Sequence, residues 1–209
     1  MDADAWDQRY AAADLVWSAE PNQVVAAECA ELPPGRAVDL AAGEGRNALW
    51  LAGRGWTVTA VDFSQVALDK GRRLAEASTG AGSVDWVRAD ATSWRPEEPV
   101  DLVVIAYLQV TAEVRRAAVR GAYASLRPGG TLLLVAHDST NLAEGTGGPQ
   151  DPAVLMSAED VVGDLDGLHP VIRSAGRVAR EVAVGDDHHE RPGEPTLTAW
   201  DCLVRVERG

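Results

Sequence analysis

Residues 38–50 read Val-Asp-Leu-Ala-Ala-Gly-Glu-Gly-Arg-Asn-Ala-Leu-Trp, an apolar run, a glycine turn and a helix opening in direct succession. The pattern predicts a short buried strand that turns on Gly43 and Gly45 and continues as a helix to about Gly53. Glycine lets a ligand approach the backbone without meeting a Cβ. A helix that begins there presents free N–H groups to the turn. We therefore expect a strand–loop–helix cradle for a ligand with a nucleoside-like body.

Asp39 distinguishes between two classes of ligand. The spacing Gly43-x-Gly45-x-x-Ala48 also fits the dinucleotide fingerprint. A carboxylate inside the cradle repels a pyrophosphate, however, and attracts a ligand that carries positive charge. Asp62 ends the next predicted strand, where a carboxylate can accept the two hydroxyls of a ribose. Together the two carboxylates favour a cationic nucleoside.

This arrangement resembles motifs I and II of the class I S-adenosylmethionine (SAM)-dependent methyltransferases. The usual motif I is acidic-x-Gly-x-Gly-x-Gly, and Ala41 stands here at the first glycine. The N-terminal Trp6-Asp7-x-Arg9-Tyr10 is followed by Trp17 and Pro21-Asn22, and is similar to the lid of the small-molecule tellurite-resistance and thiopurine methyltransferases. The resemblance implies SAM as cofactor, with Arg9 or Tyr10 at its methionyl carboxylate. The alternative for residues 1–32 is a plain helical cover of the sheet edge.

The resemblance also implies further cofactor contacts. Phe63 would cover one face of the adenine, Asp90 would accept from the adenine amino group, and the Ala91 N–H would meet a ring nitrogen. Two simpler roles stay open: Ser64 as the cap of the following helix, and Asp90 as the cap of a turn. The full set expected at the cofactor is Arg9, Tyr10, Asp39, Ala41, Gly43, Gly45, Asn47, Asp62, Phe63, Ser64, Asp90, Ala91 and Ala106.

Apolar runs and helical patterns alternate along the chain and predict an α/β class with a doubly wound sheet. Strands are expected at 36–40, 56–61, 84–89, 100–107, 131–136, 171–184 and 196–206, with a turn at 126–130. Helical patterns cover 1–30, 45–53, 64–78 and 111–125, and a short helix begins at 157. The resemblance supplies a Rossmann-like seven-stranded order, mostly parallel, with helices on both faces and an antiparallel last strand at the sheet edge. We expect one domain, 1–209, divided into a helical lid (1–32), a SAM-binding core (33–137) and substrate-side loops with a C-terminal hairpin (138–209).

Two histidines are candidates for the catalytic base. His137 ends the fifth predicted strand at the edge that carries the cradle. His189 lies in a charged loop that corresponds to a His-basic pair of the tellurite-type members. A neutral hydroxyl or amine acceptor needs such a base, whereas a thiolate or oxyanion does not. Because His188 and His189 are adjacent and would point opposite ways on an extended loop, we expect no metal site.

Composition limits the partners. The formal net charge is −13, and 19 basic residues face 32 acidic ones, which argues against nucleic acid and anionic membranes. The chain has no run of about 18 apolar residues and no signal-like start, and its two cysteines are far apart, so we expect a cytoplasmic protein. The expected function is methyl transfer from SAM to a small molecule: a thiol, an oxyanion, or a natural-product-like hydroxyl or amine. An NAD-dependent oxidoreductase and a non-catalytic SAM-binding protein remain alternatives, although the only lysine, Lys70, is expected in a helix away from the cradle. The oligomeric state stays open.

Overall fold

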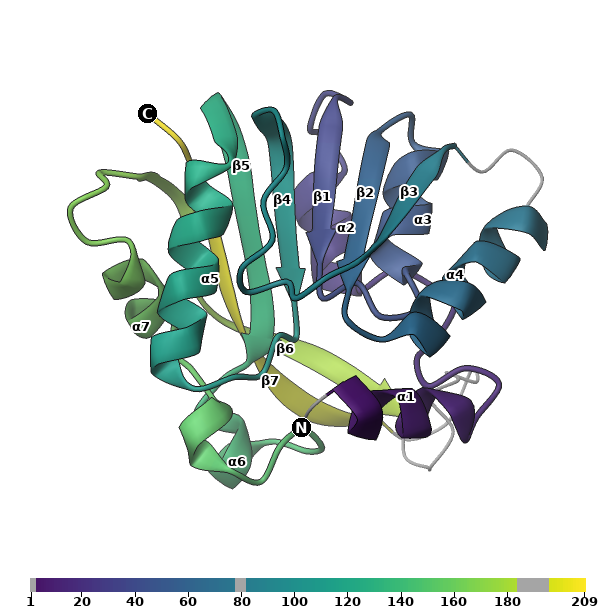
Figure 1. The fold of residues 1–209 in the computed structure, drawn as a ribbon. Coiled ribbons are helices and arrows are strands. Elements are labelled where there is room, and N and C mark those ends of the chain that lie inside the picture. Colours follow the sequence, from purple (N-terminus) through teal and green to yellow (C-terminus); the bar gives the residue numbers. More distant parts are fainter. Residues whose placement is uncertain (1–2, 78–81, 184–195) are drawn as a thin grey trace.

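The computed structural model describes residues 3–77, 82–183 and 196–209. A seven-stranded sheet forms its centre, in the order β3-β2-β1-β4-β5-β7-β6 (Figure 1). The strands are β1 Arg36–Leu40, β2 Thr57–Asp62, β3 Val84–Arg88, β4 Val100–Ala106, β5 Leu126–His137, β6 Val171–Ala183 and β7 Thr196–Glu207. The helices are α1 Ala3–Ala11, α2 Gln23–Cys29, α3 Arg46–Gly53, α4 Gln65–Ala77, α5 Ala112–Ala124, α6 Asn141–Glu144 and α7 Ala158–Asp164, with a 3-10 turn η1 at Pro152–Val154.

Strands β1 to β5 run parallel, and β7 is antiparallel to both β5 and β6. The predicted α/β class, the strand number and the antiparallel last strand are therefore confirmed. The expected edge position of that last strand is wrong, because β7 is inserted between β5 and β6. Its run Asp201–Val204 is buried, as an interior strand requires, whereas β6 begins with the exposed Val171 and Ile172.

Two local predictions also differ from the structure. The first helix ends at Ala11, and the segment that carries Ala13 and Trp17 is a loop, because its backbone N–H groups bond to a buried carboxylate instead of continuing the helix. Residues 126–130 belong to β5, since Val100 pairs with Leu126 before the register shifts. After β5, residues 141–144 form the short helix α6.

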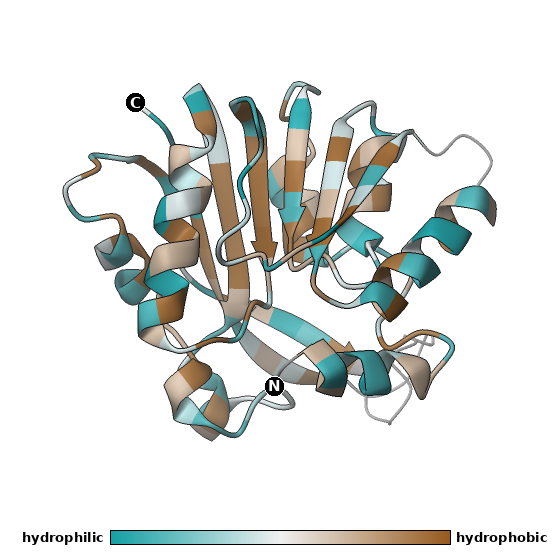
Figure 2. Cartoon of the chain, viewed as in Figure 1, coloured by the Kyte–Doolittle hydropathy of each residue, from teal (hydrophilic) through white to brown (hydrophobic). Residues whose placement is uncertain are grey.

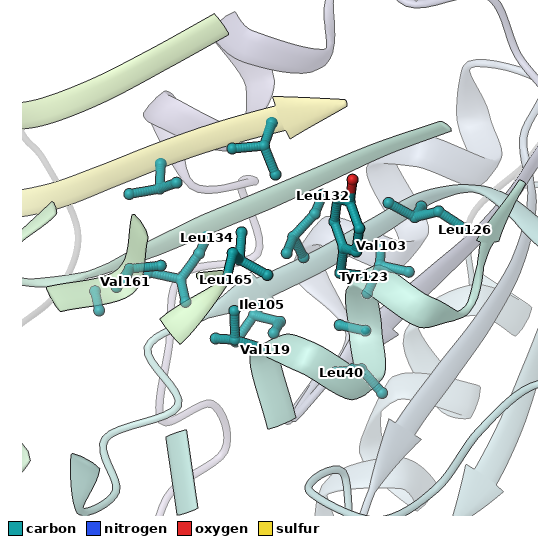
Figure 3. Packing of buried hydrophobic residues seen from close by; sticks show 14 of the residues in the cluster. Leu40, Val103, Ile105, Val119, Tyr123, Leu126, Leu132, Leu134, Val161 and Leu165 are labelled. Atoms are coloured by element: carbon teal, nitrogen blue, oxygen red, sulfur yellow. The ribbon is translucent and has the colours of Figure 1, made fainter. Parts of the chain in front are cut away.

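Two apolar layers enclose the sheet. One layer packs α5 and α7 against β4, β5 and β7, and Figure 3 shows its leucines and valines with Tyr123. The other packs α2 and α3 against the opposite face. Figure 2 shows that the centres of the strands are hydrophobic and that the outer surfaces of the helices are hydrophilic. The carboxyl ends of the parallel strands meet at one edge of the sheet, next to α1 (Figure 1), and that edge is where open α/β sheets bind ligands.

Candidate active site

The loop between β1 and α3 is built from left-handed residues. Ala41, Gly43 and Gly45 have φ values of 58°, 57° and 79°. A Cβ at Gly43 would lie 2.7 Å from Tyr10 Oη, and one at Gly45 would lie 2.4 Å from the Trp86 ring. Gly43 therefore permits close approach from above the loop, while Gly45 permits packing of β3 beneath it. Ala41, at the position of the first glycine in the motif that this loop resembles, holds a conformation that is uncommon for residues with a Cβ.

Asp62, the last residue of β2, is hydrogen-bonded to this loop. Its Oδ2 accepts from the Gly43 N–H and its Oδ1 from the Ser64 N–H, both at 2.8 Å. The side chain belongs to a residue that is 5% exposed, and burial raises its pKa, although the backbone bonds oppose that rise. Each oxygen keeps a lone pair, so the carboxylate can still accept hydroxyl groups from a ligand.

Asp39 is a buried carboxylate whose burial is only weakly compensated. The residue is 1% exposed, and neither carboxylate oxygen has a hydrogen-bond partner among the described residues. Burial raises the pKa of Asp39 to about 7, and the nearby Ala48 N–H and Arg46 charge only partly oppose this. Buried polar groups are normally satisfied, so an orphaned carboxylate calls for an explanation. A cationic ligand group in the cradle would supply one.

The N-terminal segment lies across the loop. Glu44 accepts backbone N–H bonds from Val16 (3.0 Å) and Trp17 (3.1 Å) and lies 3.2 Å from Lys70 Nζ. Lys70 also donates to the carbonyls of Tyr10 and Ala13, each at 2.5 Å. The expectation that Lys70 lies away from the cradle is therefore wrong, because its long side chain reaches back from α4 to the loop. Lys70 and Glu44 together fix the N-terminal segment in place.

A second polar cluster lies at the ends of β4 and β5. Tyr107 Oη donates to Asp201 Oδ2 at 2.6 Å and accepts from Asn22 Nδ2 at 3.1 Å. Arg180 Nε donates to the same Asp201 oxygen at 2.6 Å. Tyr107 has φ 59°, a strained conformation for an aromatic residue, and such strain concentrates at functional sites. Asp201 is completely buried and is the centre of this cluster.

His137, the first candidate base, belongs to the same cluster. Its ring centroid lies 4.9 Å from that of Tyr107, and its Nδ1 lies 3.5 Å from Asp201 Oδ1. Burial lowers the pKa of His137, with Asp201 acting against and Arg180 acting with that effect. The imidazole is therefore neutral at pH 7 and able to accept a proton. His189, the second candidate, lies outside the described residues.

The remaining expected residues are more dispersed. Asn47 is buried, and its Oδ1 accepts from the Asn22 N–H at 2.9 Å. Asp90 is exposed and accepts from the Thr92 N–H and hydroxyl, which is the turn-capping geometry. Arg9 is exposed, with its guanidinium over the rings of Trp6 and Trp17. Ser64 donates its hydroxyl to Asp7 at 2.5 Å and caps α4.

The other expected positions follow the strands. Phe63 directly follows β2 and is half-buried, Ala91 is buried after β3, and Ala106 is the half-buried last residue of β4. Sequence reasoning missed Asn22, Arg180 and Asp201. An available signal was Asp201, the single acid within the largely apolar stretch 197–206.

Two features are absent from the described residues. No three histidine, cysteine or carboxylate side chains gather there in a way that could hold a metal ion. No helix in that part of the chain is long and apolar enough to cross a membrane.

A family model described as "Methyltransferase domain" matches residues 37–130. Thiocyanate methyltransferase 1 of Brassica oleracea is 29% identical over 146 residues, which cover 69% of this chain and 63% of the relative. Trans-aconitate 2-methyltransferase of Streptomyces coelicolor is 34% identical over 136 residues, which cover 63% of this chain and 45% of the relative. The chain thus matches about half to three fifths of the length of these relatives.

Solved structures share the fold over nearly all of the chain. TehB from Haemophilus influenzae has a TM-score of 0.71 at 16% identity, covering 99% of this chain and 67% of that one. The N-methyltransferase NodS from Bradyrhizobium japonicum, in complex with S-adenosylhomocysteine, has a TM-score of 0.70 at 16% identity. The match covers 99% of this chain and 97% of the NodS chain.

Proposed function

We propose that the chain is a class I SAM-dependent methyltransferase, as its matches to a methyltransferase family model and to named methyltransferases support, and that it transfers the methyl group of SAM to a small-molecule acceptor. One observation carries this proposal. A buried carboxylate, Asp39, lies beside the glycine loop without a hydrogen-bond partner among the described residues, and Asp62 lies at the end of the neighbouring strand. A sulfonium nucleoside satisfies both, because its positive charge faces one carboxylate and its ribose hydroxyls meet the other. NAD would bring a pyrophosphate to Asp39 instead.

SAM supplies the methyl group in an already activated form, bound to a positively charged sulfur. The protein's task is to align the acceptor with the methyl carbon and to exclude water. The acceptor nucleophile forms a bond to the methyl carbon as the carbon–sulfur bond breaks, and S-adenosylhomocysteine leaves. The N-terminal segment, fixed by Glu44 and Lys70, covers the loop and supports this exclusion of water.

The polar cluster at the ends of β4 and β5 is the proposed acceptor side. For a hydroxyl or amine acceptor, the neutral His137 would take the proton, with Asp201 beside its Nδ1 to stabilise the charge that forms. A thiolate or oxyanion acceptor would need no such transfer. The names of the relatives, thiocyanate and trans-aconitate methyltransferases, support a small acceptor. The net charge of −13 speaks against nucleic acid, and we propose a cytoplasmic location.

The test is a transfer assay with SAM labelled in its methyl group. The purified chain is incubated with panels of thiols, oxyanions, carboxylates, phenols and amines, and label in each acceptor is counted. We expect label in at least one class and an equal amount of S-adenosylhomocysteine. Binding of SAM without transfer to any panel would instead support the non-catalytic alternative.

A further inference from the structure

A pocket lies at the edge of the sheet opposite the candidate active site. Its volume is about 540 Å³, and its walls come from the end of α5, the loop after α7 and the residues that follow β7. Figure 1 shows the C-terminus beside the start of β5, at the edge opposite α1. The side chains that matter below are those of Arg120, Tyr123, Ala124, Leu168, His169 and Arg208. The pocket is therefore separate from the glycine loop.

Two partly buried arginines line this pocket without an acidic partner. Arg120 Nη1 donates to the carbonyls of Asp164 and Asp166, each at 3.0 Å. Arg208 Nη1 donates to two carbonyls between α5 and β5, of which that of Ala124 lies at 2.9 Å. These bonds hold both side chains in place. They leave Nε and Nη2 of each guanidinium without a partner among the described residues, and neither arginine forms an ion pair there.

Unpaired arginines are unexpected in so acidic a chain, with 32 acidic and 19 basic residues. Arg115 and Arg116, earlier in α5, both pair with Asp164. Arg127, at the start of β5, pairs with Asp101 at 2.5 Å. Of the described residues that line the pocket, none is an aspartate or a glutamate. The pocket thus concentrates positive charge on a protein whose formal net charge is −13.

The rest of the lining is mainly apolar. Leu168 and Ala124 are part of it, together with Tyr123, whose Oη donates to the Leu168 carbonyl at 3.4 Å. Pockets for small molecules typically have volumes of about 300–1,000 Å³ and are mostly apolar, with a few polar groups that fix the ligand's orientation. A planar guanidinium can bind a carboxylate or a phosphate through two parallel hydrogen bonds. This pocket has both features.

We infer that this pocket binds a small organic anion, with its charged group at Arg120 and Arg208 and its apolar body against Leu168 and Tyr123. A carboxylate and a phosphate ester share this chemistry. An inorganic anion would leave the apolar wall in contact with water, so we expect the apolar body to contribute to affinity. Gly209, which also lines the pocket, forms no ion pair with either arginine. Because the pocket lies apart from the cradle, the inference does not depend on the proposed function.

The test compares 2-naphthoate and 2-naphthyl phosphate with the uncharged 2-naphthamide and with inorganic phosphate. Dissociation constants come from amide NMR shifts of the full chain, which also show where each probe binds. Every titration is repeated with saturating S-adenosylhomocysteine. The first of the two anionic probes to saturate the protein identifies the preferred charged group.

Four variants test the two arginines. Ala124 is exposed, so Ala124→Glu adds a carboxylate to the pocket without disturbing the core, and Ala124→Gln is its control of equal size without the charge. Arg120→Gln removes one cation directly. Arg127→Gln is its matched control, because it removes an arginine at the same edge of the sheet that is already paired. If Arg120→Gln does not fold, the two Ala124 variants still decide the question.

We expect the better of the two anionic probes to shift the amides of Leu168, His169 and Gly209. It should bind at least about 10-fold more tightly than 2-naphthamide, the lower end of the range for hydrogen bonds to charged groups. Ala124→Glu and Arg120→Gln should each weaken it by about 10-fold or more. Ala124→Gln and Arg127→Gln should leave its affinity unchanged, and so should saturating S-adenosylhomocysteine.

Several outcomes would overturn the inference. Equal binding of the anions and 2-naphthamide, or equal effects of Ala124→Glu and Ala124→Gln, would mean that only the apolar wall binds. Inorganic phosphate that binds as tightly as the aromatic anions would reduce the pocket to a non-specific ion site. Shifts at Gly43 and Gly45 that disappear with S-adenosylhomocysteine would place the probes in the cradle, and an absence of binding to wild type would remove the site. Failure of S-adenosylhomocysteine itself to bind would count against the proposed function alone.

Discussion

The replacement Asp39→Asn tests whether the buried carboxylate of Asp39 lowers the free energy of unfolding of the ligand-free protein. Asp39 is 1% exposed and has no hydrogen-bond partner among the described residues, and its pKa is raised from 3.8 to about 7. The folded protein therefore holds this proton more tightly than the unfolded chain. The associated stability is fully present below pH 3.8 and is lost as the pH rises through 7. At pH 8 the ionised carboxylate makes folding less favourable than its neutral form would.

The magnitude follows from the pKa difference. Each pKa unit corresponds to about 1.4 kcal/mol, so a rise of roughly three units amounts to about 4 kcal/mol at pH 8. The new amide is buried in the same place without partners, which costs about 1–3 kcal/mol. We therefore expect Asp39→Asn to increase the free energy of unfolding at pH 8 by about 1–3 kcal/mol. In a chain of this size, that gain raises the Tm by roughly 2–12 °C.

The assay is thermal or urea unfolding of nucleoside-free protein between pH 5 and pH 8. The advantage of Asp39→Asn over wild type should grow as the pH rises and shrink toward pH 5. Asp164→Asn is a matched control, because Asp164 is also buried but lies 2.6 Å from the buried Arg115. Removing one member of such a pair should destabilise by about 3–5 kcal/mol. A variant at Asp39 that is less stable than wild type at pH 8, or whose advantage does not depend on pH, would refute the reasoning.

Three further predictions concern the site. Asp62→Ala should weaken SAM by about 1–3 kcal/mol in calorimetry, because ribose hydroxyls and the Gly43 N–H lose their acceptor; unchanged affinity would remove Asp62 from the site. Lys70→Met should lower the free energy of unfolding by about 1–3 kcal/mol and expose the N-terminal segment to limited proteolysis, because buried Glu44 loses its cation; a proteolysis pattern like that of wild type would contradict this. His137→Asn should reduce kcat for neutral acceptors by about 100-fold or more and leave anionic acceptors nearly unchanged. With wild type the rate on neutral acceptors should rise through a pKa below 6.5 and stay flat above pH 7, and an equal loss for both acceptor classes would assign His137 a structural role only.

The sequence predicts those parts of the molecule that depend on local pattern. The β1–loop–α3 unit follows from an apolar run, two glycines and a helix opening, and Asp62 follows from its place at the end of β2. The capping box at Ser157 and Asp160 confirms the predicted start of α7 in the same way. Each of these signals spans only a few residues, so the spacing of apolar residues and the residue types at turns and helix starts are sufficient to find them.

Other features depend on pairings between distant residues and leave no such signal. The insertion of β7 between β5 and β6 is decided by which strand buries both faces, and an alternating pattern does not reveal its neighbours. Tyr107 and Asp201 are 94 positions apart and meet only in the folded sheet. The contact of Lys70 with the carbonyls of Tyr10 and Ala13 likewise depends on how the N-terminal segment crosses the loop.

The most direct test of the central claim is calorimetric titration of wild-type protein with SAM, S-adenosylhomocysteine and NAD. We expect saturable binding of both S-adenosyl nucleosides and no heat of binding with NAD, because NAD would bring a pyrophosphate to Asp39. Binding of NAD together with silence toward SAM and S-adenosylhomocysteine would contradict it.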